Sequence, residues 1–143
     1  MMSAVAEQNK AVIRRFFDAW NHRQSEAFDD LIAPNVIRHC EATPGVEVRS
    51  LDHVKEFLRQ DTAAFPDSVQ NVKLLVAEGD LVAAWTTYEG TQLGPLGPLP
   101  PSGRKAAFDF GAMFRLESGK IAEWWVTWDN MTILRALGHL PGG

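Results

Sequence analysis

The chain has 143 residues, of which 45% are hydrophobic and 22% charged, so it is long enough to bury a substantial core without a metal or disulfide staple. Its net charge of -4 and its pI near 5.5 supply no positive field for a phosphate backbone, which argues against nucleic acid as a partner. The single cysteine, Cys40, cannot form an internal disulfide, and no apolar run approaches the roughly 20 residues that cross a bilayer. We therefore expect one cytoplasmic domain over residues 1–143, without membrane contact.

An amphipathic helix is predicted over residues 4–22, because the apolar side chains recur there at spacings of 3, 4 and 7. Phe16 and Trp20 belong to this apolar stripe, and both are candidate substrate-binding residues if the helix covers a pocket. A second, short helix is predicted to begin at Ser25, a favourable N-cap residue, and to be stopped by Pro34.

A short strand and a third helix are predicted next. Residues 35–45 are typical of a strand that leads into a turn, and Ser50 is a candidate N-cap for a helix that ends near Phe65. Beyond this point the hydrophobic period changes from 3.6 towards 2, which predicts four long strands. Tight turns at Gly79 and at Ser118 predict two hairpins.

The segment 93–104 contains four prolines and three glycines, which exclude a central strand. It is either a structured hairpin loop or an apolar lid over a pocket. A final helical pattern begins after Asp129, with Asp129 or Asn130 as its N-cap, and ends at Gly138. This order of elements predicts an α+β fold in which helices cover one face of a mostly antiparallel sheet and leave a conical cavity.

The last predicted strand has two faces, both of which carry tryptophan. Strand alternation places Trp125, Thr127 and Asp129 on one face and Trp124 on the other. If Asp129 faces the cavity beside Trp125, dry surroundings raise its pKa and make it a better general base. The alternative is that Asp129 only caps the terminal helix.

Four segments, "VIRRFFDAWN", "LIAPNVIRH", "PPSGRKAAFDFGAMFRLESGKIAEWW" and "WDNMTILRALG", carry a resemblance that spans essentially the whole chain. They resemble the SnoaL-like polyketide (ester) cyclases of the nuclear transport factor 2-like superfamily. The resemblance implies a cone of three N-terminal helices packed on a strongly curved, mostly antiparallel sheet, no metal or cofactor, and a homodimer or homotetramer. It also implies that Asp129 is the catalytic acid/base. Trp125 and Thr127 are candidate substrate-binding residues because strand alternation places them on the same face as Asp129.

The well-studied cyclases of the family use a histidine, on the strand before the last hairpin, as a second polar group in the reaction. In this chain the corresponding position falls near Ala112, and the segment holds no histidine. His39 is the candidate replacement as a catalytic residue, since it can face the cone from the short strand. Arg38, Asp109 and Tyr88 are candidate substrate-binding residues. Each has a structural alternative: a surface ion pair for Arg38, a cross-strand ion pair for Asp109, and core packing for Tyr88.

The function expected from the resemblance is cofactor-independent acid/base chemistry of the aldol type on a hydrophobic, polyketide-like small molecule. An isomerase, hydratase or epoxide hydrolase of the same fold is an alternative. A non-catalytic small-molecule-binding or dimerisation domain is another. Metal sites are weakly supported, because His39 and Glu41 form the only ligand-like spacing, and no dinucleotide-binding glycine pattern is present.

Overall fold

The computed structural model describes residues 4–141. Its helices are α1 (Ala4–Asn21), the 3₁₀ turn η1 (Ser25–Ala27), α2 (Phe28–Leu31), α3 (Leu51–Ala64) and α4 (Asn130–Ala136). Its strands are β1 (Ile32–His39), β2 (Val69–Glu78), β3 (Leu81–Thr91), β4 (Lys105–Glu117) and β5 (Lys120–Thr127). Over these described residues, no helix is both long enough and apolar enough to span a membrane.

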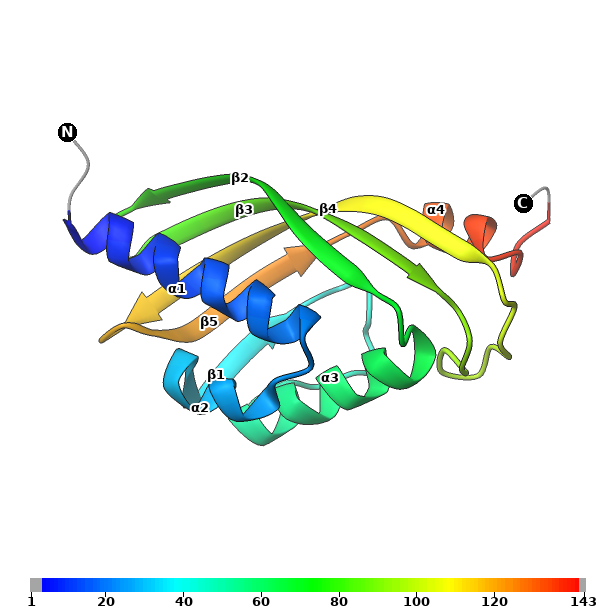
Figure 1. The fold of residues 1–143 in the computed structure, drawn as a ribbon, viewed down its shortest axis with the longest axis horizontal. Coiled ribbons are helices and arrows are strands. Elements are labelled where there is room, and N and C mark those ends of the chain that lie inside the picture. The colour runs from blue at the N-terminus through cyan, green and yellow to red at the C-terminus, as the bar shows by residue number, and fades with distance from the viewer. Residues whose placement is uncertain (1–3, 142–143) are drawn as a thin grey trace.

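The described strands form one curved sheet. Its strand order is β1-β5-β4-β3-β2, with β1 parallel to β5 and every other pair antiparallel. Figure 1 shows α1, α2 and α3 on the same side of this sheet, and α4 at the end where β5 finishes. The predicted α+β arrangement, with helices on one face of a mostly antiparallel sheet, is confirmed.

The core lies between α1 and the concave face of the sheet. Along β4 the buried side chains alternate with exposed ones, and Phe110 and Phe114 point towards the helices. The Phe16 ring of α1 lies 5.7 Å from the rings of both Phe114 and Trp124. Each such side chain contributes roughly 1.5–3 kcal/mol by leaving water. Apolar side chains buried between α1 and the sheet therefore hold α1 against the concave face.

The second helix is shorter than predicted. It ends at Leu31, and Pro34 lies inside strand β1 instead of stopping a helix. A proline is tolerated there because β1 is an edge strand, and the register of β1 is irregular between Ile32 and Ile37. Ser25 is the first residue of η1 and not its N-cap, which is Gln24 and makes no capping hydrogen bond from its side chain.

Other local predictions are confirmed. The Ser50 hydroxyl accepts a hydrogen bond from the His53 backbone N–H at 3.1 Å, and so caps α3. The two tight turns lie between β2 and β3 and between β4 and β5, where Gly79 and Gly119 have φ values of 59° and 79°.

A β-bulge interrupts β5. Leu116 pairs with Ile121, but the preceding β4 residue, Arg115, pairs with Glu123, so Ala122 has no partner of its own. One extra residue in a strand reverses which side chains face the core beyond it. The bulge therefore decides the orientation of the C-terminal half of β5.

Candidate functional site

A cavity of about 760 Å³ lies between the concave face of the sheet and helices α1 and α3. Aromatic side chains form much of its wall, among them Phe16, Trp20, Phe57 and Trp124. The loop residues 42–46 and 95–99 and the start of α4 also line it. This volume and largely apolar lining are typical of a small-molecule site.

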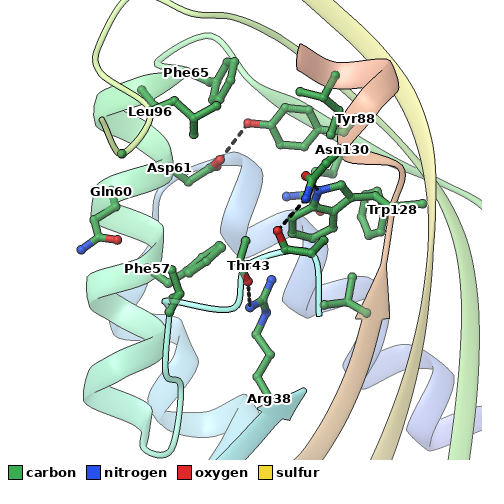
Figure 2. Close-up of a pocket in the computed structure, with 18 of the residues that line it drawn as sticks. Arg38, Thr43, Phe57, Gln60, Asp61, Phe65, Tyr88, Leu96, Trp128 and Asn130 are labelled. Carbon is green, nitrogen blue, oxygen red and sulfur yellow. Dashed lines mark hydrogen bonds between the residues drawn. The ribbon is translucent and has the colours of Figure 1, made fainter. Parts of the chain in front are cut away.

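Asp61, on α3, is the only carboxylate among the described residues that line the cavity. The Tyr88 hydroxyl donates a hydrogen bond to its Oδ1 at 2.7 Å. The Trp20 indole N–H and the Ser68 hydroxyl donate to its Oδ2 at 3.1 and 3.4 Å. Figure 2 shows the Asp61 carboxylate and the Tyr88 hydroxyl pointing at each other across the cavity wall. The three donors come from α1, from β3 and from the segment before β2, so they fix the carboxylate from several sides.

Burial sets the protonation properties of this cluster. Desolvation raises the pKa of the Asp61 carboxyl, although the hydrogen bonds from Tyr88 and Trp20 and the charge of Arg23 oppose that rise. Burial and the neighbouring Asp61 charge raise the pKa of the Tyr88 phenol above its ordinary value. Tyr88 is therefore a protonated donor at neutral pH, whereas Asp61 is the group that can exchange a proton.

Asp61 is not among the residues that the sequence singled out. A signal for it does exist in the α3 sequence. Val54, Phe57 and Leu58 form the apolar stripe of this helix, and Asp61 is the next position on the same stripe, seven residues after Val54. An acidic residue on an apolar stripe indicates either a structural partner or a buried functional group.

Arg38, on β1, contributes the positive charge of the cavity wall. Its guanidinium lies 4.4 Å from the centre of the Phe57 ring and 5.8 Å from that of Trp128. Nη1 donates to the Thr43 hydroxyl at 3.4 Å, as Figure 2 shows. Burial lowers the pKa of Arg38, and the nearby Cys40 sulfur opposes that shift.

Four predicted substrate-binding residues lie at the cavity wall. They are Phe16, Trp20, Arg38 and Tyr88. Their roles in substrate binding stay predictions.

Trp125 and Thr127 lie on the opposite face of the sheet from the one expected. Beyond the bulge, Trp124 and Val126 are buried and line the cavity, while Trp125 and Thr127 are exposed. Simple alternation from Ile121 leads to the wrong face, because the bulge adds one residue. The expectation that Trp125 and Thr127 line the pocket is therefore wrong.

His39 and Asp109 also lie on the outer face of the sheet. His39 pairs with Trp125 in the parallel register, stacks on its indole at 5.3 Å, and contacts Glu123 Oε2 at 2.6 Å through Nε2. Asp109 is exposed and forms an ion pair with Lys73 at 3.3 Å. The expectation that either side chain enters the cavity is wrong, because each alternates with an inward neighbour on its strand.

Asp129 is the N-cap of α4. Its Oδ1 accepts the Met131 backbone N–H at 2.9 Å, and its Oδ2 accepts the Thr132 hydroxyl at 3.0 Å. These hydrogen bonds lower the pKa of this solvent-exposed carboxyl. The expectation of a dry carboxylate with a raised pKa is therefore wrong, and the capping alternative is confirmed. The general-base role predicted for Asp129 has no support in this geometry.

Within residues 4–141, no group of three or more His, Cys, Asp or Glu side chains is placed to hold a metal ion. The titratable groups that line the cavity are the half-buried Asp61 carboxyl, the Tyr88 phenol and the Arg38 guanidinium. A curved sheet closed by helices in this way is the fold of the nuclear transport factor 2-like α+β proteins, such as one from Burkholderia pseudomallei K96243 that has a TM-score of 0.77 at 18% identity.

The family model of the SnoaL-like polyketide cyclases matches residues 10–137, and the chain belongs to this family. Wild-type IdmH from Streptomyces antibioticus, a proposed polyketide cyclase, is 30% identical with a TM-score of 0.81, over 92% of this chain and 99% of that one. TsrD from Streptomyces laurentii is 26% identical with a TM-score of 0.83, over 98% and 100%. A proposed SnoaL-like cyclase from Jannaschia sp. CCS1, 22% identical over 99% of both chains, shares the fold with a TM-score of 0.88. No curated protein matches the sequence significantly.

Proposed function

We propose that this protein is an acid/base enzyme of the polyketide-cyclase type, which closes a ring in a hydrophobic small molecule inside the cavity. Asp61 is its general base and acid, and Tyr88 is its hydrogen-bond donor. The observation that carries the proposal is the Asp61 carboxylate at the wall of an apolar cavity, 2.7 Å from a phenol that stays protonated.

The first step is proton abstraction next to a carbonyl group. Asp61 Oδ1 accepts one hydrogen bond and keeps a lone pair for a substrate C–H. When the C–H bond breaks, the proton forms an O–H bond on Asp61 and the electron pair becomes an enolate. The raised pKa of Asp61 brings its basicity closer to that needed at neutral pH.

Tyr88 stabilises the enolate. Once Asp61 is protonated, its oxygen is a weaker acceptor, so the Tyr88 hydroxyl can turn its hydrogen bond to the developing enolate oxygen. A donor of this kind, held ready in a dry site, is worth roughly 10²- to 10³-fold in rate. The enolate carbon then attacks a second carbonyl in the same molecule, and the resulting alkoxide takes its proton back from Asp61.

Exchange of carbon-bound hydrogen tests the base without knowledge of the natural substrate. The protein is incubated in D₂O buffer with polycyclic ketones such as 2-acetylnaphthalene, and deuterium incorporation next to the carbonyl is followed by NMR. We expect Asp61→Asn to lower the protein-dependent exchange rate by roughly 10²- to 10⁴-fold. Tyr88→Phe should lower it as well, by roughly 10²-fold.

Asp129→Asn is the matched control, because it removes the same negative charge from the surface. It should leave the exchange rate at the wild-type value and lower the melting temperature slightly, since Asn keeps an acceptor for the Met131 N–H but loses the negative charge and the Oδ2 acceptor of the Thr132 hydroxyl. Exchange that survives Asp61→Asn but disappears in Asp129→Asn would reverse the assignment and restore the base inferred from the family resemblance.

A non-catalytic binding domain is the second candidate, and one observation favours it. Asp61 already accepts three hydrogen bonds, from Trp20, Ser68 and Tyr88, and these alone give it a structural role that joins α3 to its neighbours. In that case, ketones bind in the cavity but their exchange rate equals that in buffer alone.

A further inference from the structure

Arg38 is a half-buried cation that, among the described residues, has no carboxylate partner. Over residues 4–141, no carboxylate forms an ion pair with its guanidinium, although ten other ion pairs are present in that part of the chain. The charge that acts on Asp61 is that of Arg23, not of Arg38. A buried guanidinium normally has a paired carboxylate, because desolvation of an unpaired charge is costly.

The hydrogen-bonding capacity of Arg38 is also largely unused. A guanidinium carries five N–H donors, and this one makes a 3.4 Å hydrogen bond to Thr43 and an interaction with the Cys40 sulfur. The rings of Phe57 and Trp128 flank it and hold its plane beside the cavity. Planar donors fixed in this way match the two oxygens of a carboxylate.

We propose that Arg38 binds a carboxylate of the substrate, so that the cavity accepts an apolar molecule with an acidic end. Figure 2 shows Arg38 extending from β1, and Asp61 projecting from α3, into the same space. The two groups lie at separate places in a largely apolar wall. A bound molecule would place its carboxylate at Arg38 and its reactive carbon near Asp61.

This inference rests on the proposed function only in taking the same cavity as the substrate site. A substrate carboxylate close to Asp61 would be repelled by its negative charge, and desolvation already disfavours the ionised form of Asp61. The position of Arg38 away from the Asp61 hydrogen-bond cluster therefore gives the substrate one orientation in the cavity. Arg38 is then a specificity-determining residue, whether or not Asp61 acts as a base.

A matched pair of probes tests the carboxylate directly. 1-Pyrenebutyric acid, which is ionised at pH 7, and its neutral methyl ester share the same ring system, and calorimetry or tryptophan quenching gives the Kd of each. We expect wild-type protein to bind the acid at least about tenfold more tightly than the ester. Arg38→Gln should abolish this preference by weakening the acid roughly ten- to hundredfold, with the ester changed by about twofold at most.

Arg59→Gln is the control variant, since it removes the same charge from the exposed side of α3 and should keep the preference for the acid. Equal affinity of wild-type protein for acid and ester would overturn the proposal without the need for any variant. If a folded Arg38→Gln variant loses affinity for the acid and the ester equally, the proposal is also overturned, because the residue would then only support the cavity wall. Asp61→Asn should keep the acid preference, so a failure of the proposed base does not imitate a failure at Arg38.

Discussion

The carboxylates of Asp61 and Asp129 differ in the groups that surround them. Asp61 is half-buried and receives its hydrogen bonds from side chains of distant segments, whereas Asp129 is exposed and bonded to the two residues that follow Asn130. Desolvation dominates in the first case and raises the pKa, while hydrogen bonds dominate in the second and lower it. Identical side chains thus acquire different chemistry from their surroundings.

The raised pKa of Asp61 predicts a pH dependence of stability at this residue. Its folded-state pKa lies above the ordinary 3.8, so the native state binds the proton more tightly than the unfolded chain. The stabilising contribution is full below the unfolded pKa and is lost as pH rises through the folded pKa, with a slope of at most about 1.4 kcal/mol per pH unit. Urea unfolding at several pH values should show this trend in wild-type protein and not in Asp61→Asn.

Asp67→Asn is the control, because the contribution of Asp67 to stability should have the opposite pH dependence. Asp67 accepts two hydrogen bonds of 2.7 Å from Thr91, which lower its pKa. Its contribution is present above its unfolded pKa and is lost as pH falls through the folded pKa. For each aspartate, the contribution is the free energy of unfolding of wild-type protein minus that of the Asn variant. If the contribution of Asp61 falls on acidification, as that of Asp67 should, the desolvated environment described for Asp61 is contradicted.

Among the elements, β5 and the segment 93–104 decide what the cavity contains. The bulge at Ala122 turns Trp124 inward and Trp125 outward. The segment 93–104 is anchored to the end of α3, because the Leu93 and Gly94 N–H groups both donate to the Ala64 carbonyl. Residues 95–99 then line the cavity.

Gly94 is predicted to be required for this anchor. A Cβ at this position would lie 2.1 Å from the Ala63 carbonyl oxygen, which is backbone and cannot turn away. Gly94→Ala should therefore displace the loop, lower the free energy of unfolding by about 1–3 kcal/mol, and weaken binding of pyrenebutyric acid methyl ester. Denaturant unfolding and a binding titration measure the two effects.

Gly45→Ala is the matched substitution, because a Cβ there meets no atom within 4 Å. It should change the free energy of unfolding by no more than about 0.5–1 kcal/mol. Equal behaviour of the two variants would show that close packing of the loop on α3 is not what holds it.

At the scale of the whole molecule, no helix within residues 4–141 covers the convex face of the sheet, and this face carries an apolar band. Leu74 pairs with Trp85 across β2 and β3, and Met113 pairs with Trp125 across β4 and β5. Leu74 is 65% exposed and Trp85 46%. An exposed apolar band that crosses several strands is unusual for a monomer.

We propose that this convex face is the contact between two copies of the chain, in line with the homodimer or homotetramer implied by the family resemblance. Light scattering after gel filtration should give a mass of at least about twice 15.9 kDa. Trp85→Glu should shift it to the monomer, because a charge would be buried in the contact.

Val5→Glu, on an exposed apolar residue of α1, should leave the mass unchanged. A wild-type protein that elutes as a monomer at micromolar concentration would rule out this contact.

The sequence by itself determined the type and order of nearly all elements, the cap at Ser50, and the apolar stripe of α1. These features depend on periodicity and on hydrogen bonds between residues close in the chain, so they can be inferred locally. It also carried the family resemblance that the comparisons confirm.

Only the tertiary structure decided the contents of the site. Asp61 and Tyr88 are 27 residues apart in the chain, and the closeness of α3 and β3 brings them together. The inward side of β5 depends on its register with β4, where a single unpaired residue reverses the alternation that periodicity predicts. The burial that raises the pKa of Asp61 is a property of the packed chain and cannot be inferred from any single segment.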